Sequence, residues 1–83
     1  MNRVKILLFA TLRERAGGAK FIELDLPDGA TVHTLKEQIA SQHPNLAPSM
    51  KSVIATINRE FAFDEARLPT GAELAMFPPV SGG

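Results

Sequence analysis

The chain has 83 residues, which is enough for one small domain and too few for two. Nine basic and nine acidic residues cancel, and no basic block stands out, so neither a nucleic acid nor an anionic membrane is expected as a partner. The apolar runs are too short to span a bilayer, and the first residues lack the pattern of a signal peptide. We therefore expect a cytoplasmic protein.

Several kinds of chemistry are excluded by the residues that the chain lacks. Cysteine is absent, which rules out a disulfide, a thiolate nucleophile and a zinc ribbon. His33 and His43 lack the spacing of a metal-binding motif, and we expect them on the surface of a helix. Gly17 and Gly18 lack the spacing of a nucleotide-binding loop. The sequence therefore predicts no metal, no intrinsically bound cofactor and no catalytic machinery of its own.

Two strands are predicted at the start of the chain. Apolar residues alternate over residues 4–10 and again over residues 21–26, which is typical of strands that bury one face. Residues 11–20 are polar and charged, and Gly17-Gly18 marks a turn within them. We expect the two strands to pair as an antiparallel hairpin.

One helix is predicted next, over residues 31–43. Thr31 is a plausible N-cap, and Pro44 ends the helix because the residue before a proline avoids the helical region. The apolar residues fall on a single stripe at helical spacing: Val32, Leu35, Ile39 and Ala40.

Shorter elements are predicted in the second half of the chain. They are a loop over residues 44–50, a strand over 52–58, a tight turn at 58–60, a return strand over 61–63, a loop over 64–72 and a last strand over 73–80.

The predicted order of elements favours a two-layer α+β sandwich with a mixed sheet. A single helix cannot cover both faces of the sheet, so it packs across one face. This order indicates the β-grasp, the ubiquitin-like fold, over residues 1–77, with an extended tail over residues 78–83. The expected core is Val4, Ile6, Leu8, Ile22, Leu24, Leu26, Val32, Leu35, Ile39, Leu74 and Met76.

Several apolar residues are left over on the opposite face of the predicted sheet. Leu7, Phe9, Phe61 and Phe77 all lie outside the face that the helix covers. Exposed apolar clusters of this kind mark protein–protein contacts. The sequence therefore predicts a docking patch.

The sequence closes with Pro-Pro-Val-Ser-Gly-Gly. This order of stiff and then slim residues suits insertion of the terminal carboxyl group into the active site of a second protein. That group is an unreactive anion at neutral pH and needs activation, most often by ATP-dependent adenylation. Gly82 and Gly83 carry no side chains, so they fit a narrow slot in a second protein. Pro78 and Pro79 stiffen the exit from the last strand. If the chain carries sulfur, the lack of cysteine means that it does so on the terminal carbonyl carbon, as a thiocarboxylate.

Four stretches resemble one known family, the small sulfur-carrier subunits of molybdopterin synthase. They are VKILLFATLRERAG, ATINREFA with Asn58, LPTGAEL and FPPVSGG. Related carriers of thiamin thiazole synthesis and ubiquitin-like tRNA-thiolation modifiers share the Gly-Gly but usually lack the double proline. Gly71-Ala72-Glu73 departs from the family's common Gly-Asp-Glu, which removes one carboxylate from a turn.

The resemblance implies a carrier that has no catalytic machinery of its own and serves as a subunit of a sulfurtransferase. An activating enzyme similar to the ubiquitin-activating enzymes would use ATP to adenylate Gly83, and a sulfur donor would convert the adenylate to a thiocarboxylate. The tail would then enter the large synthase subunit and give its sulfur to cyclic pyranopterin monophosphate. Two small subunits and a large-subunit dimer would form a heterotetramer.

The resemblance also implies which residues meet the partners. Gly83 and Gly82 would be the reacting terminus, and Arg13 falls where family members often meet the activating enzyme, although a solvated loop arginine fits equally well. Three alternatives stay open: a carrier for thiamin or cysteine synthesis, a modifier that joins lysines through Gly83, and an interaction module with an idle tail. The expected partner-binding residues are Phe9, Phe61, Phe77, Pro78, Pro79, Val80, Ser81 and Arg13.

Overall fold

A computed structural model describes residues 1–79 of the protein, so predictions that concern residues 80–83 lie outside the described part. The described residues form two α-helices, one 3₁₀ helix and five strands. In chain order they are β1 (Asn2–Leu8), α1 (Thr11–Arg15), β2 (Phe21–Leu26), α2 (Val32–Gln42), the 3₁₀ helix η1 (Ala47–Lys51), β3 (Ile54–Ile57), β4 (Glu60–Ala62) and β5 (Leu74–Phe77).

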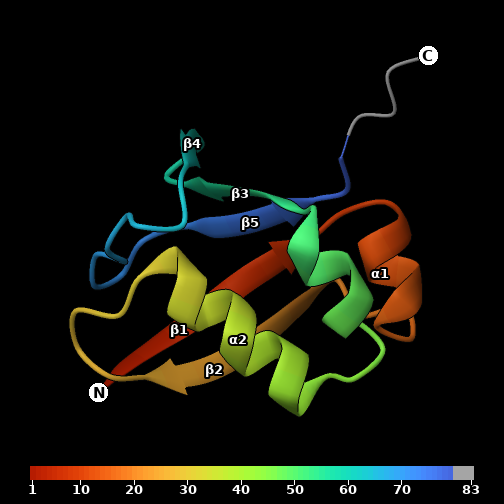
Figure 1. Cartoon of the computed structure of the whole chain (residues 1–83), viewed down its shortest axis with the longest axis horizontal. Helices are drawn as coiled ribbons and strands as arrows, with labels where there is room; N and C mark the ends of the chain where they lie inside the picture. Colours follow the sequence, from red (N-terminus) through yellow and green to blue (C-terminus); the bar gives the residue numbers. More distant parts are fainter. Residues whose placement is uncertain (80–83) are drawn as a thin grey trace.

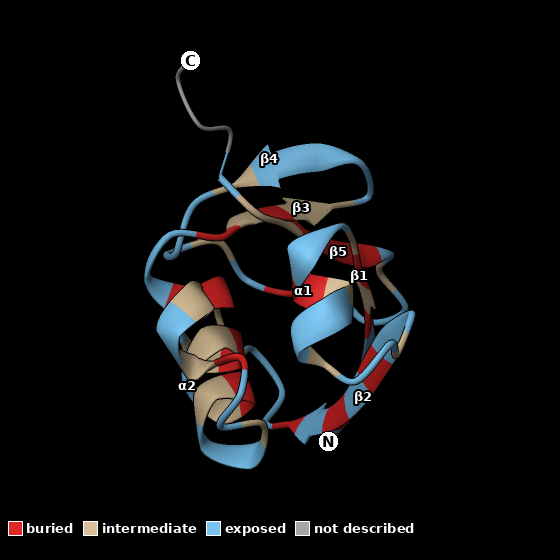
Figure 2. Ribbon diagram, turned by 90° about the vertical axis from the view of Figure 1, so that its right-hand side faces the viewer, coloured by how far each residue is buried: buried red, intermediate tan, exposed pale blue. Residues whose placement is uncertain are grey.

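The strands form one mixed sheet in the order β2-β1-β5-β3-β4. Its centre is the parallel pair of the first and last strands, β1 and β5, and every other pair is antiparallel. The helix α2 lies across one face of this sheet (Figure 1), and an edge-on view separates the helix layer from the strand layer (Figure 2). The predicted β-grasp architecture of two α+β layers is therefore confirmed.

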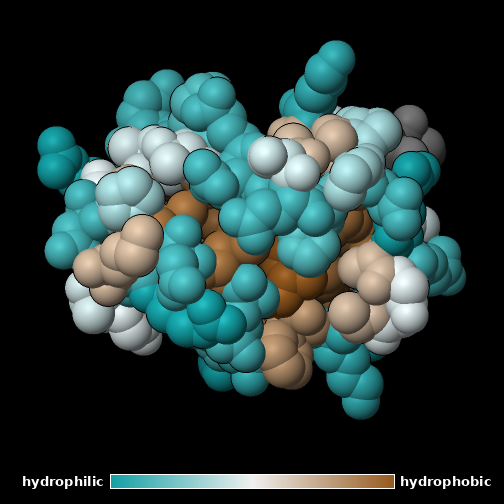
Figure 3. Space-filling model, turned by 90° about the horizontal axis from the view of Figure 1, so that it is seen from below, coloured by the Kyte–Doolittle hydropathy of each residue, from teal (hydrophilic) through white to brown (hydrophobic). Residues whose placement is uncertain are grey.

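The core lies between α2 and the sheet, and all eleven residues expected there are buried. Apolar side chains lie in a recessed central band between hydrophilic ones when the molecule is seen from below (Figure 3). Alternation along β1 and β2 and the helical period of α2 thus predicted the buried faces correctly. The structure adds further buried apolar side chains to the core: Leu12, Leu46, Met50, Val53, Ala55 and Leu68.

The prediction of a single helix was wrong. Thr11–Arg15 is the short helix α1, within the segment expected to be a polar turn, and Leu12 is only 1% exposed. A five-residue helix with one buried apolar side chain shows no helical period, so the pattern could not reveal it.

A second short helix replaces part of an expected loop. Ala47–Lys51 forms η1, and the buried side chains of Leu46 and Met50 attach it to the core. Its length also falls below what periodicity can detect.

The start of α2 is held by its own cap and by the loop that follows β4. Thr31 acts as the predicted N-cap, since its Oγ1 accepts a hydrogen bond from the Thr34 amide at 3.3 Å. The amides of Val32 and His33 donate to the carbonyls of Ala66 and Asp64, both at 2.9 Å. The loop is therefore fixed against the helix by the backbone donors that a helix start leaves free.

An ion pair adds to this attachment. Lys36 Nζ lies 2.7 Å from Asp64 Oδ1. The hydrogen bond from Lys36 lowers the pKa of the Asp64 carboxyl below its usual value, although burial opposes the shift. The charged form of Asp64 is therefore the form that the fold stabilises.

Candidate functional site

The parallel pairing of β1 with β5 brings two distant phenylalanines together. Leu8 lies opposite Met76 in the register, and both side chains are buried in the core. Because side chains alternate along a strand, the residues that follow them turn to the other face. There the rings of Phe9 and Phe77 stack, with centroids 4.6 Å apart and planes 9° from parallel.

A turn and a short helix hold Phe9 in place. Ala10 has φ 54°, a left-handed value that favours glycine, and it lets the chain bend directly into α1. From α1, Arg13 Nε donates to the Leu8 carbonyl at 3.2 Å. The guanidinium carbon lies 5.7 Å from the centre of the Phe9 ring, within cation–π range. Arg13 therefore braces Phe9 from within the chain.

The register of β5, β3 and β4 adds further apolar side chains to the same face. Phe77 lies opposite Ile54, and Thr56 lies between Ala75 and Phe61. The Phe61 side chain is 82% exposed. We call this outward surface, built on Phe9, Phe61 and Phe77, the aromatic patch.

A shallow depression of about 550 Å³ opens on the aromatic patch. Four of the residues predicted to bind partners therefore line a single surface. The lining residues are Phe9, Ala10, Ile54, Thr56, Arg59, Phe61, Phe77 and Pro78.

The base of the predicted tail lies at this depression. Pro78 follows the last residue of β5 directly and is half-buried, while Pro79 is exposed. The remaining tail residues that were predicted to act, Val80, Ser81, Gly82 and Gly83, lie outside the described residues. Their roles stay predictions, and so do the partner roles of Arg13, Pro78, Pro79 and the aromatic patch.

Two exposed residues near the patch were missed by sequence reasoning. Arg59 lines the depression from the turn between β3 and β4. Phe63, just after β4, is 83% exposed. Alternation with Phe61 was a signal for Phe63, whereas nothing in the residue pattern distinguished Arg59 from an ordinary turn residue.

Within residues 1–79 no three or more histidine, aspartate or glutamate side chains gather closely enough to hold a metal ion. In the same residues no helix is long and apolar enough to cross a membrane. His33 lies on α2, as expected, with its exposed ring 3.3 Å from Glu37. The expectation was wrong for His43, which is the C-cap residue just after α2 and is half-buried.

Fold and surface together define a ubiquitin-like domain with an apolar face at the base of its C-terminal segment. The chain belongs to the ThiS family, whose model matches residues 6–83. The resemblance read from the sequence is thereby confirmed at the level of the family.

Curated relatives align along nearly the whole chain. One from Chlamydomonas reinhardtii is 39% identical and covers 98% of this chain and 99% of its own length. One from Arabidopsis thaliana is 34% identical and covers 96% of this chain and 82% of its own length. Both are named molybdopterin synthase sulfur carrier subunit.

A solved structure supports the same fold. The H. volcanii small archaeal modifier protein 1 superposes with a TM-score of 0.83 at 28% identity, covering 96% of this chain and 100% of its own. The β-grasp prediction is thus confirmed by comparison as well as by topology.

Proposed function

We propose that this chain is the sulfur-carrier subunit of a molybdopterin synthase and has no catalytic machinery of its own. The observation that carries the proposal is the name shared by relatives at 34% and 39% identity, aligned over 96% and 98% of the chain. Its partners would be a large synthase subunit, an activating enzyme and a sulfur donor. The heterotetrameric assembly and the cytoplasmic location stay predictions.

The proposed chemistry takes place at the carboxyl group of Gly83. A carboxylate oxygen attacks the α-phosphorus of ATP on the activating enzyme, and pyrophosphate leaves. Sulfide sulfur from the donor then displaces AMP and leaves a thiocarboxylate. In the large subunit the thiocarboxylate sulfur attacks a carbon of cyclic pyranopterin monophosphate and displaces an oxygen substituent from that carbon. Water then cleaves the bond between the sulfur and the Gly83 carbonyl carbon, which leaves the sulfur on the substrate and restores the carboxylate.

The contribution of the described residues is to position that terminus. Phe9 and Phe77 stack where β5 ends, so a protein that docks on them also fixes the point from which the tail starts. Pro78 and Pro79 restrict the backbone beyond this point. Holding a reacting group near its target in this way removes much of the entropy cost of the transfer.

Intact-mass analysis tests the loading step. After incubation with the activating enzyme, ATP and a sulfur source, we expect the mass gain of one oxygen replaced by sulfur. Deletion of Gly83 should abolish this gain and the synthase activity, while thermal unfolding stays unchanged because residues 1–79 are untouched. Full synthase activity from the truncated chain would refute the proposal.

A second candidate function is a protein modifier joined to lysine side chains through Gly83. The likeness to a protein named small archaeal modifier protein 1, at 28% identity and a TM-score of 0.83, favours it. The same incubation, with host extract added, separates the two candidates. Isopeptide adducts on lysines would support the modifier, whereas thiocarboxylate alone would support the carrier.

A further inference from the structure

The turn between β3 and β4 places an arginine where the backbone favours glycine. Asn58 has φ 50° and Arg59 has φ 70°, the pattern of a two-residue turn that matches the twist of a hairpin. Asparagine tolerates this conformation, but the second position usually carries glycine. Residues held in strained backbone conformations cluster at functional sites.

The strained turn is bound to the residue that precedes β5. The backbone N–H of Asn58 donates to the backbone carbonyl of Glu73 at 2.8 Å. The backbone N–H of Glu73 donates in return to the side-chain oxygen Oδ1 of Asn58 at 2.9 Å. Arg59 Nε then donates to Glu73 Oε2 at 3.1 Å. Glu73 therefore fixes both the turn and the arginine side chain.

Arg59 stays largely open to a partner although it is fixed. Its side chain is 86% exposed, and Glu73 is its only charged partner in residues 1–79. A guanidinium group has five N–H donors, and here Nε is the one that binds Glu73. The amino groups at its tip thus retain their capacity to bind a second carboxylate.

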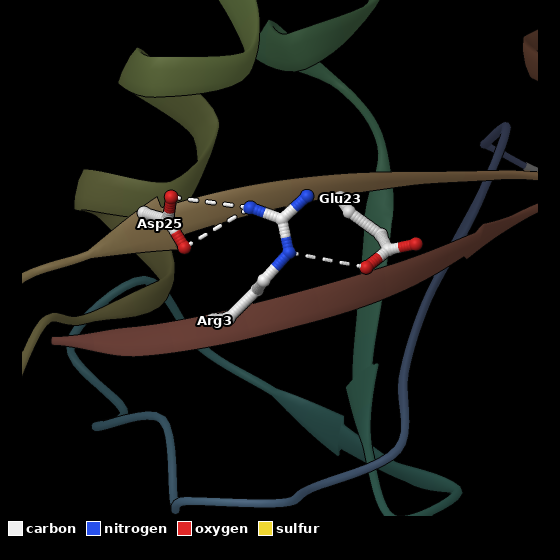
Figure 4. A network of polar contacts seen from close by, with 3 residues as sticks. All are labelled: Arg3, Glu23 and Asp25. Atoms are coloured by element: carbon white, nitrogen blue, oxygen red, sulfur yellow. Dashed lines mark hydrogen bonds and ion pairs between the residues drawn. The ribbon is translucent and has the colours of Figure 1, made fainter.

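Arg3, on the same face of the sheet, shows what a fully paired arginine looks like in this protein. Its Nε binds Glu23 at 3.3 Å, and its Nη1 binds both oxygens of Asp25 at 3.1 Å (Figure 4). Arg3 therefore binds two carboxylates from its own chain. Arg59 has the first of these in Glu73 and lacks an equivalent of the second within the described part.

Arg59 also borders a hollow with a floor of small side chains. This hollow, of about 390 Å³, is lined by the apolar side chains of Leu7, Phe9 and Phe77 and by the Arg59–Glu73 pair. Ala75 and Thr56 line it as well, and Ala75 is 8% exposed. The space above a short side chain admits an apolar side chain from a partner, next to the free tip of Arg59.

We propose that Arg59 is a specificity-determining residue that binds a carboxylate of the docking protein, with an adjacent apolar side chain of that protein in the hollow over Ala75. The identity of the docking protein as the large synthase subunit rests on the proposed function. Glu73 is a positioning residue, because it aims Arg59 without meeting the partner carboxylate itself.

Calorimetric titration of the large subunit with full-length carrier tests this pairing. Arg59→Gly should weaken binding about tenfold at low salt, as expected for a charge at the rim of an interface, and less at high salt. Its unfolding temperature should not fall, since glycine suits the backbone at this position. Arg59→Lys should retain part of the affinity because it keeps the charge but loses the planar fork. Glu73→Gln should give an intermediate loss.

Two control variants separate the possible failures. Arg15→Ala removes the same charge from α1 and should bind like the wild type, so an equal loss would mean a net-charge effect and overturn the proposal. If Phe77→Ala weakens binding and Arg59→Gly does not, the proposal is wrong while the proposed function stands. A loss for Arg59→Gly that does not depend on salt also overturns it. If the wild-type chain does not bind the large subunit, both proposals fail.

Discussion

The outer face of the sheet, turned away from α2, has a charged half and an aromatic half. In the charged half, Arg3 lies between Glu23 and Asp25, and Lys5 lies 4.1 Å from the centre of the Phe21 ring. In the aromatic half, Phe9, Phe61 and Phe77 surround an open depression. The strand β1 contributes to both halves, because it contains Arg3 and Lys5 and leads directly into Phe9.

The contrast teaches that exposure alone does not mark a docking surface. The charged side chains satisfy one another, and Asp25 above all, with Glu23, raises the pKa of Arg3 and favours its charged form. In the aromatic half, stacking leaves Phe9 and Phe77 only half-buried, and Phe61 is 82% exposed. Covering the aromatic half therefore yields a hydrophobic gain that covering the charged half does not.

The largest expected effects come from neighbouring residues on opposite faces of β5. Met76→Ala should reduce the free energy of unfolding by about 2–4 kcal/mol, because it leaves a cavity in the core. Phe77→Ala should cost about 2 kcal/mol or more in binding to the large subunit, as a buried aromatic anchor does. Urea unfolding and calorimetric binding of both variants measure the two effects.

Phe77→Ala is the variant that can break this contrast. If it lowers the unfolding free energy as much as Met76→Ala does, the stacked pair belongs to the core and the aromatic half is not primarily a docking surface.

A smaller effect is expected from one substitution in each half of the outer face. Phe61→Ser removes a ring that is 82% exposed, so unfolding should change by no more than about 0.5 kcal/mol. Its affinity for the large subunit should fall about tenfold, within the range of interface truncations. Arg3→Gln, the matched substitution in the charged half, should leave affinity unchanged. Equal losses in both variants would mean that the whole face docks.

The smallest effect tests the premise that paired surface charges contribute little to stability. The folded-state pKa of Asp64 lies below its unfolded value because Lys36 donates a hydrogen bond to it. The pair therefore stabilises the fold above the unfolded pKa of aspartate, near 4, and this contribution disappears as pH falls through the folded value. Lys36→Met should remove about 0.5 kcal/mol at neutral pH, the size expected for a partly exposed pair.

Unfolding free energies of Lys36→Met and the wild type, measured from neutral to strongly acidic pH, test this expectation. The two curves should converge at low pH. A constant gap at every pH would assign the loss to packing of the lysine stem instead of the charge.

Residue patterns predicted much of this fold because the buried faces follow simple periods. Alternation assigned Met76 and Phe77 to opposite faces, and the helical stripe of α2 assigned Leu35 and Ile39 to the core, as the structure confirms. These assignments need only the local geometry of a strand or a helix.

Other features depend on how distant segments pair. The stacking of Phe9 on Phe77 follows from the parallel register of β1 and β5, which no local pattern encodes. Leu12 was missed because α1 is too short to show a period. The role proposed for Arg59 depends on the backbone of its turn and on Glu73, and both became visible only in the folded chain.

The position of β5 in the middle of the sheet has a consequence for how the protein is made. β5 is the last strand of the described part, yet it separates β1 from β3, so the sheet stays in two pieces until this segment has been synthesised and inserted. The ring of Phe77 meets that of Phe9 only at that moment. A protein that docked on both rings would therefore favour chains in which β5 has been inserted over chains in which it has not.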